Sequence, residues 1–437
     1  MNRRDFLRTG LAAAGIAPLA SLRLFAKQKS RKPNIILIMA DDVGYECFGC
    51  YGSKQYRTPR IDRMAAGGVR FTNCHSTPLC TPSRVKIMTG RDNVRNYVDF
   101  GAFPKGEKPF SEILKGKGYA TCFSGKWQLQ GAGVNPEDIG FDEICKLDTR
   151  GSWPRYWDTE FKINGKRIPR KPGVYGPDVF TDFVIDFIRK KQDKPLLVYF
   201  PMTLVHSPFP PTPKSKNRKS KDRQKNFEDM VAHMDACIGK ILDSLKEADL
   251  MDSTVVLFTG DNGTNQVLSS TLDGKTIRGD KGYTRDHGTH VPLIVTGPGV
   301  PAGKVCEDLI DFSDFLPTMA EIAGADLPKD VQLDGRSFWP QCRGRKGNPR
   351  EWLFNYYFPR PYANRYDNRY QHSEIRWVRN KEYKLYGDGR FYNVLKDVLE
   401  QRPLSPDDAS EMRQSLQKVL NSMPRKGARI NYKKTRS

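Results

Sequence analysis

Short apolar runs alternate along this chain with longer stretches in which apolar residues recur every three or four positions. The short runs predict buried strands at residues 34–40, 119–123, 195–200, 254–258 and 291–299. The longer stretches predict helices at residues 60–66, 110–115, 178–191, 227–250 and 312–325. Strands that alternate with helices are typical of a layered α/β domain, here with a mixed, mostly parallel sheet between helical layers.

The pattern changes after about Trp339. Residues 350–392 are rich in Tyr, Arg, Trp and Asn, and the alternating stretches EIRWVRN and EYKLYG are typical of antiparallel strands. A helix is predicted at residues 406–420, followed by a basic tail. The sequence therefore predicts a main domain over residues 31–340 and a C-terminal α+β subdomain with a basic tail over 341–437.

The N-terminus has the features of an export signal. MNRRDFLRTGLAAAGIAPLA carries Arg3-Arg4, then Phe6-Leu7, then a short and weakly apolar run. This pattern is typical of a twin-arginine signal, and the run is too short for a membrane-spanning helix. We expect residues 1–30 to engage the twin-arginine translocation machinery and the mature protein to be periplasmic or otherwise exported. No transmembrane segment is predicted in the mature chain.

Charge narrows the class of partner. The 72 lysines and arginines exceed the 50 aspartates and glutamates by 22, and the isoelectric point is near 9.5. Such a balance fits a polyanion: nucleic acid, an acidic polysaccharide or an anionic membrane surface. No nucleic-acid-binding motif accompanies the charge, so no nucleic-acid partner is predicted. The lysine-rich residues 214–225 are expected to form a solvated loop close enough to His206 to flank a binding cleft.

The nine cysteines do not suggest a disulfide framework. Their odd number leaves at least one thiol outside any set of intramolecular disulfides, and Cys80 is the candidate. Cys47 and Cys50 have metal or redox spacing, but no second pair completes a zinc site.

Cys80 occupies an unusual position, directly before Thr-Pro-Ser-Arg. Thr81 suits the cap of a helix and Pro82 its first position. A thiol just upstream would meet unpaired backbone N–H groups and the positive end of the helix dipole, with Arg84 about one turn on. This setting favours an anion or a group that handles anions. The alternative is a buried structural cysteine.

Three of the predicted strands run into groups that handle charge. Asp41-Asp42 follow the first strand, Asp261-Asn262 follow the strand at 254–258, and His206 follows the strand at 195–200. Ligands bind beyond the carboxyl ends of strands in open α/β sheets, so these side chains are expected to meet. An all-oxygen set suits a hard cation such as Ca²⁺ or Mg²⁺. Ordinary turn chemistry is the alternative for each pair alone.

The stretch CTPSRVKIMTGR resembles the signature of the formylglycine-dependent (type I) sulfatases, a branch of the alkaline-phosphatase-like superfamily. Further matches follow in family order across residues 33–300: ADDVGYECFGCYGS, GKWQL, HSPFPP, FTGDNG and DKGYTRDHGTHVPLIVTGPG. The resemblance implies a sulfuric ester hydrolase. It also implies a three-layer sandwich around the mixed sheet, with a small C-terminal antiparallel sheet and one helix.

The resemblance also implies roles for single residues. Cys80 would be converted to formylglycine by a formylglycine-generating or sulfatase-maturing enzyme. One oxygen of the aldehyde hydrate would attack sulfur, and the other would later expel sulfate. Arg84 would orient the hydrate. Lys126 and Lys281 would clamp the sulfate oxygens, and His206 would bind the substrate and is a candidate to protonate the leaving oxygen.

The resemblance assigns the oxygen-rich set to a divalent cation, usually calcium in this family, with magnesium as the alternative. The ligands it implies are Asp41, Asp42, Asp261, Asn262 and the hydrate derived from Cys80.

One position departs from the family pattern. The family usually writes G-K-W-H-L-G where this chain reads GKWQLQ, so Gln128 replaces the histidine assigned to proton removal. Glutamine can donate and accept hydrogen bonds there but cannot titrate near neutral pH. His287 and His290 follow Lys281 closely and are candidates to supply an imidazole.

The expected substrate is a sulfate ester on a sulfated polysaccharide or its oligosaccharides, because the basic chain fits such a carbohydrate. Two alternatives remain at this point. A formylglycine-dependent phosphonate or phosphodiester hydrolase would use the same clamp on tetrahedral phosphorus. A polyanion-binding protein that has lost turnover is suggested by Gln128.

Overall fold

A computed structural model describes residues 32–147, 154–190, 193–361 and 374–428. The predicted export signal at residues 1–30 and the end of the basic tail lie outside the described residues. Among the described residues, no helix combines the length and the apolar composition needed to span a bilayer.

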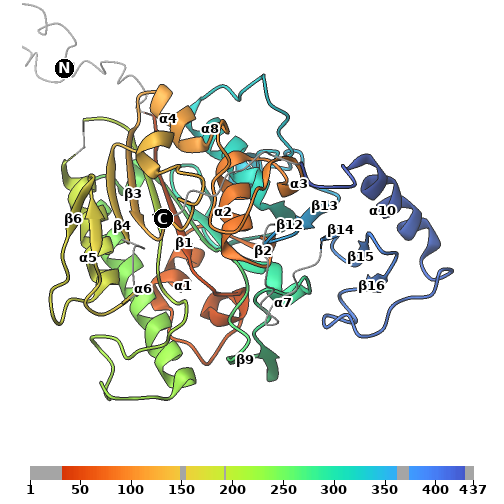
Figure 1. The fold of residues 1–437 in the computed structure, drawn as a ribbon, viewed down its shortest axis with the longest axis horizontal. Coiled ribbons are helices and arrows are strands. Elements are labelled where there is room, and N and C mark those ends of the chain that lie inside the picture. The colour runs from red at the N-terminus through yellow and green to blue at the C-terminus, as the bar shows by residue number, and fades with distance from the viewer. Residues whose placement is uncertain (1–31, 148–153, 191–192, 362–373, 429–437) are drawn as a thin grey trace, which may run out of the picture. The chain divides into compact units, whose positions relative to one another are not determined.

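A ten-stranded sheet forms the centre of the described structure (Figure 1). Strands β8, β1, β7, β3 and β4 run parallel to one another, and the strands toward both edges include antiparallel pairs. In spatial order the strands are β12 (Lys304–Asp311), β2 (Val69–His75), β11 (His290–Thr296), β8 (Thr254–Gly260), β1 (Asn34–Ala40), β7 (Leu196–Pro201), β3 (Ala120–Gly125), β4 (Glu143–Leu147), β5 (Phe161–Ile163) and β6 (Lys166–Ile168).

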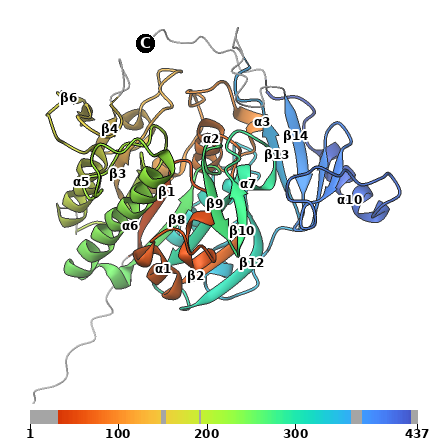
Figure 2. The same cartoon turned by 90° about the horizontal axis from the view of Figure 1, so that it is seen from below.

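Helices cover both faces of this sheet because its inner strands are apolar on both sides. In β1, Ile36 and Ile38 belong to one core and Ile35 and Leu37 to the other, as the period of two in a strand requires. The first core is covered by α1 (Pro59–Ala66), α5 (Gly176–Lys190) and α6 (Arg223–Glu247), which lie together on one side of the sheet in Figure 2. The second is covered by α2 (Cys80–Thr89), α4 (Phe110–Gly116) and α8 (Phe315–Ala323).

Shorter elements complete the layers. The hairpin of β9 (Ser269–Leu272) and β10 (Lys275–Arg278) forms a separate two-stranded sheet. The short helices are α3 (Asn93–Asn96), α7 (Asp286–Thr289) and α9 (Trp339–Cys342), with 3-10 turns at Tyr45–Cys47, Gly49–Tyr51, Pro136–Ile139, Met251–Ser253 and Phe312–Asp314.

A four-stranded antiparallel sheet follows near the C-terminus. Its strands, in order, are β13 (Leu353–Tyr357), β14 (Ile375–Arg379), β15 (Tyr383–Tyr386) and β16 (Phe391–Asn393). Leu416 and Leu420 of α10 (Ser410–Ser422) pack on one face, while Leu79, directly before α2, packs among aromatic residues of the sheet. The predicted α/β fold with a small antiparallel sheet and one helix is confirmed.

Two local predictions need correction. Helix α6 begins at Arg223, where Asp222 caps it by accepting from the Lys225 amide at 3.1 Å, so the end of the lysine-rich segment is helical. Helix α2 begins at Cys80, so Thr81 is not the cap. Pro82 is tolerated at the third helical position because the first N–H groups of a helix have no intrahelical partner.

Candidate active site

Four neighbouring parallel strands, β3, β7, β1 and β8, place predicted site residues together at the carboxyl ends of the strands. Ala40 pairs with Gly260 at the ends of β1 and β8, which sets Asp41 beside Asp261. The Asp261 amide donates to the Ala40 carbonyl at 2.9 Å, and the Asp42 amide donates to Asp261 Oδ1 at 3.0 Å. Parallel register therefore brings carboxylates together that are about half the chain apart.

Asp41 is fully buried and surrounded by cations. Its carboxylate accepts from Lys126 Nζ at 2.8 Å and from an Arg155 guanidinium nitrogen at 2.9 Å, and an Arg84 nitrogen lies 3.7 Å away. Burial alone would raise the pKa of Asp41, but Lys126 and its cationic neighbours hold the pKa well below the usual range.

The close approach of two strand ends places Lys126. Gly125, the last residue of β3, has φ of 122°, and a Cβ there would lie 2.1 Å from the Pro201 carbonyl oxygen. The Lys126 amide donates to this same carbonyl at 2.8 Å. Only glycine allows this approach, which explains the glycine before the lysine in GKW.

Asp42 forms the second half of the charge network. Its Oδ2 accepts from Lys281 Nζ at 2.5 Å and lies 3.4 Å from His206 Nε2. Its Oδ1 accepts from the Asn262 amide nitrogen at 2.9 Å. Burial opposes ionisation of Asp42, but the ion pair with Lys281 brings its pKa below the usual range. Asp42 is therefore an anion, although it is entirely buried.

His206 is held as a neutral imidazole. Burial lowers its pKa well below the ordinary value, against the effect of Asp42. With Nδ1 donating to the Ser207 carbonyl at 2.5 Å, Nε2 is left as the acceptor for Lys281 Nζ at 3.1 Å. Lys281 Nζ thus contacts both Asp42 and His206, and the three side chains form one unit.

Asp261 is the third buried carboxylate of the site, and its pKa is raised rather than lowered. Burial, together with the nearby Asp41 carboxylate, raises the pKa of Asp261 to about 7, even though Arg84 donates to it at 2.8 Å. Asn262 Oδ1 is buried and has no hydrogen-bond partner among the described residues. A buried acid that resists ionisation and an unused amide oxygen are the features expected where a hard cation binds.

Cys80 lies at this same point. Its sulfur and one carboxylate oxygen each of Asp41 and Asp261 lie within 4.8 Å of one another. Arg84, one turn further along α2, also donates to the Lys126 carbonyl at 2.8 Å and so ties the helix to the end of β3. The residues present therefore fit a divalent cation held by oxygen atoms next to residue 80.

The turn before Cys80 is fixed by hydrogen bonds between side chain and backbone. Ser83 Oγ accepts from the Thr77 amide at 3.1 Å and lies 2.7 Å from Thr77 Oγ1. Leu79 occupies the cap position of α2 and offers no side-chain acceptor. The first N–H groups of the helix are thus not capped by a side chain, which favours an anion beside residue 80.

Arg155 also belongs to the site, although it was not predicted. It is buried against Asp41, and the neighbouring Tyr156 hydroxyl donates to the carbonyl oxygens of Thr203 and His206. Neither spacing nor a charged motif marks it in the sequence, because it lies within the aromatic segment WPRYW, which has no strand pattern. Its role is evident only in the structure, where this loop returns to Asp41 at the carboxyl end of β1.

Gln128 and His287 both lie near the site residues along the chain. Gln128 has φ of 56°, and its Oε1 is buried without a hydrogen-bond partner among the described residues. His287 is buried, and its carbonyl oxygen would lie 1.8 Å from a Cβ built on Gly263, directly after Asn262. The backbone of His287 therefore packs against the loop that carries Asp261 and Asn262.

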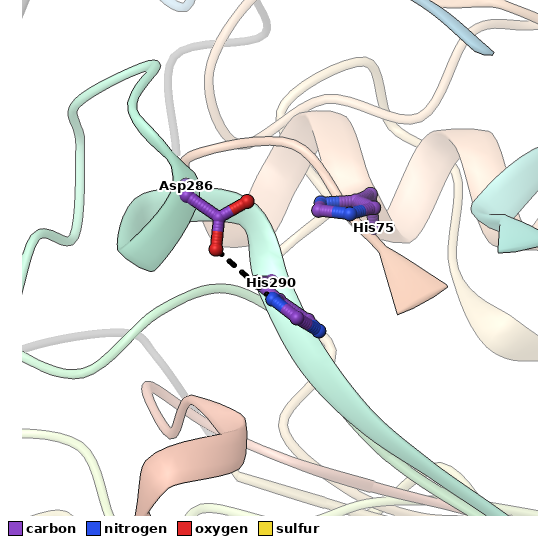
Figure 3. Close-up of side chains that lie close together, drawn as sticks. All are labelled: His75, Asp286 and His290. Atoms are coloured by element: carbon purple, nitrogen blue, oxygen red, sulfur yellow. Dashed lines mark hydrogen bonds and ion pairs between the residues drawn. The ribbon is translucent and has the colours of Figure 1, made fainter. Parts of the chain in front are cut away.

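His290 belongs to a separate buried cluster (Figure 3). Its Nδ1 lies 3.0 Å from Asp286 Oδ2, and its Nε2 lies 2.8 Å from the Thr72 carbonyl oxygen. His75 completes the cluster, and Arg379 of β14 donates to Asp286 at 2.5 Å. Both ring nitrogens of His290 are thus engaged, and the cluster links the central sheet to the C-terminal sheet.

Replacing Arg379 by methionine is expected to lower the free energy of unfolding by about 3–5 kcal/mol, because it leaves the buried Asp286 carboxylate without its guanidinium partner. Burial opposes ionisation of Asp286, and His290 and Arg379 keep its pKa well below the usual range. Denaturant unfolding measures the change. Arg390→Met is the control, since Arg390 pairs with Asp388 at the surface, where a pair contributes at most about 1 kcal/mol. Equal losses in both variants would contradict a structural link through Asp286.

Comparison with known proteins gives matches along most of the chain. The family model described as Sulfatase matches residues 33–325, and the model for the C-terminal part of N-sulphoglucosamine sulphohydrolase matches residues 277–424. The chain is 31% identical over 366 residues to arylsulfatase A of Homo sapiens, covering 75% of this chain and 71% of that protein. It is 30% identical over 367 residues to N-acetylgalactosamine-6-sulfatase of Canis lupus familiaris, covering 75% and 69%. The crystal structure of Ps i-CgsB in complex with k-i-k-neocarrahexaose has a TM-score of 0.74 and 25% identity, covering 90% of this chain and 92% of that one.

Proposed function

The chain belongs to the sulfatase family of sulfuric ester hydrolases, and from this premise we propose that it removes sulfate from sulfated polysaccharides or their oligosaccharides. One observation carries the proposal: Cys80 converges with Asp41 and Asp261 at the end of the sheet, and buried lysines and an arginine surround them. A carbohydrate substrate is supported by relatives whose names specify an amino sugar sulfate or a bound oligosaccharide.

The cationic side chains would bind the sulfate group. Lys126 pairs with Asp41, and Lys281 pairs with Asp42. Their charges would neutralise the sulfate oxygens, where negative charge grows as the ester bond breaks. His206 would hold Lys281 in place and hydrogen-bond the substrate, with protonation of the leaving oxygen as a further role.

Asp41, Asp42, Asp261 and Asn262 would hold the divalent cation, which we assign as calcium, with magnesium as the alternative. When bound, such an ion supplies charge that stabilises the ionised nucleophile and the sulfate oxygens. Arg84 would keep residue 80 pointed at the substrate, because its guanidinium is fixed by the Asp261 carboxylate and the Lys126 carbonyl.

Cys80 would be converted to formylglycine by a formylglycine-generating or sulfatase-maturing enzyme. The aldehyde hydrate supplies a nucleophile that can later expel sulfate without attack by water on a crowded anion. Residues 1–30 would direct export by the twin-arginine machinery to the periplasm or beyond, a route that carries folded proteins and so permits modification before export.

Gln128 would act as a hydrogen-bonding group. Its unpartnered Oε1 can accept from a hydroxyl of the substrate or of the modified residue 80. The amide cannot take up a proton near neutral pH, so proton transfer would fall to another group or to water.

The proposal is tested by comparing a sulfated oligosaccharide with a phosphodiester and a phosphonate monoester. We expect kcat/KM for the sulfate ester to exceed kcat/KM for the other two substrates by about a hundredfold or more. The reason is that the sulfate group then fits the lysine clamp and the sugar leaving group fits the rest of the site. Ion chromatography quantifies the sulfate released from the oligosaccharide, the phosphomonoester formed from the phosphodiester, and the free phosphonate formed from the phosphonate monoester. Faster phosphodiester cleavage would favour the alternative hydrolase, and tight glycan binding without release of sulfate would favour a polyanion-binding protein.

A further inference from the structure

A cleft of about 630 Å³ opens directly beside the sulfate-binding side chains. Lys281, whose Nζ contacts Asp42 and His206, lines its inner end. Its walls come from the segment after His206, the first turn of α6, the loop before β9 and the end of β10. A substrate whose sulfate reaches Lys281 would therefore extend into this cleft.

The charged side chains that line the cleft are all positive. Lys221, Arg223 and Arg278 line it together with Lys281, and none of the described lining residues is acidic. Lys281 is neutralised by Asp42. The other three are exposed and form no ion pair with any described residue. Three uncompensated cations in one cleft attract an anion, and their effect is screened by salt.

Hydrogen bonds tie together the wall segments that carry the cleft arginines. Arg278 Nε donates to the Gln266 carbonyl at 3.1 Å, and the Gln266 side-chain amide donates to the Lys281 carbonyl at 2.6 Å. On the facing wall, Gln224 accepts from the Ser269 amide at 3.1 Å and so joins the first turn of α6 to β9. Arg278 is thus linked through Gln266 to the backbone of Lys281, and the helix turn that carries Arg223 is joined to β9.

The cleft also offers an apolar surface. Val267 is 56% exposed, and Pro208 and Phe209 line the wall near it. Phe209 is held in place by an edge-to-face contact with Phe227 at 5.7 Å between ring centres. Small apolar patches between guanidinium groups suit the C–H face of a sugar ring that carries charged substituents.

We propose that this cleft binds a second anionic group of the substrate, a sulfate or a carboxylate on a neighbouring sugar, through Arg223, Arg278 and Lys221. The inference rests on the proposed function and extends it: the preferred substrate is an oligosaccharide with at least two anionic groups, of which one is cleaved at residue 80 and the other is held in the cleft. Arginine suits this task because its planar fork binds oxyanions in a bidentate manner.

The test compares Arg278→Gln and Arg223→Gln with the unsubstituted protein on three substrates: a monosulfated aryl ester, a disulfated oligosaccharide, and a sulfated oligosaccharide whose other anion is a uronate. We expect each variant to raise KM for a doubly anionic substrate about tenfold more than KM for the aryl ester, with kcat for that oligosaccharide little changed, because a hydrogen bond to a charged group is lost. The oligosaccharide that responds identifies the second anion as sulfate or carboxylate. Lys246→Gln, at the far end of α6, is the control for loss of one positive charge.

Equal changes for all three substrates, or changes no larger than those of Lys246→Gln, would overturn the proposal. Release of no sulfate from any substrate by the unsubstituted protein would instead refute the proposed function. In that case calorimetric titration with the same oligosaccharides still tests the cleft: about tenfold weaker binding to Arg278→Gln than to Lys246→Gln supports it, and equal affinities overturn it.

Discussion

Replacing Cys80 by alanine is expected to abolish sulfate release, with a fall in kcat/KM of about 10⁴-fold or more. Cys80 begins α2 with its sulfur beside the carboxylates of Asp41 and Asp261, so its modified form is the proposed nucleophile at this point of the site. Alanine keeps the helix start and removes the group that would attack sulfur. Initial rates on a sulfated oligosaccharide measure the loss, and unchanged thermal melting would show that the fold is retained.

The matched control is Cys50→Ala, since Cys50 is a half-buried free cysteine outside the site. It should keep its activity. The mass of the tryptic peptide 71–84 from protein made in its native host supplies the second readout. Exchange of the thiol for an aldehyde oxygen would establish formylglycine at Cys80. An unmodified thiol in an active enzyme, or full activity in Cys80→Ala, would contradict the proposed chemistry.

Removal of divalent cations is expected to be the second large effect. Chelation should lower kcat/KM by about a hundredfold or more, because the sulfate and the nucleophile at residue 80 then lose a source of charge stabilisation. Folding stability should respond as well. Calcium at a hundred times its dissociation constant stabilises the folded state by about 2.7 kcal/mol, which a melting curve recorded with and without calcium detects.

Asn262→Ala separates a specific site from general ion effects. It removes the buried amide oxygen that has no partner among the described residues, and it should weaken the calcium-dependent shift in melting temperature. Magnesium in place of calcium identifies the preferred ion. A chelated enzyme with full activity, or an Asn262→Ala variant with the same calcium shift, would show that the cation is not held here.

The pattern along the chain predicted the inner part of the sheet well and its edges poorly. Strand β1 was predicted at its observed bounds, because a strand covered on both faces is a continuous apolar run. Strand β12 was not predicted. It lies at the sheet edge, and its residues KVCEDLID mix charged and apolar positions without regular alternation. Helix α6 began earlier than its apolar pattern, since its first turn is polar and defined by the Asp222 cap.

The site residues likewise fall into those that the sequence predicted and those that only the structure revealed. The motifs around Cys80, Asp41 and Asp261 could be recognised in the sequence because each is a short local pattern, and the order of the strands allowed them to meet. The sequence could not reveal Arg155 on Asp41, the engagement of both His290 nitrogens in the link through Asp286, or the grouping of Arg223 with Arg278 in one cleft.

The sequence by itself therefore determined the class of fold, the family and the residue types at the reacting centre. The tertiary structure alone decided which cation neutralises which carboxylate, which buried acid is left with a raised pKa, and which residues line the cleft. The physical reason is that local periodicity and short motifs record burial and turn geometry, whereas ion pairing and desolvation depend on the packing of segments that are distant along the chain.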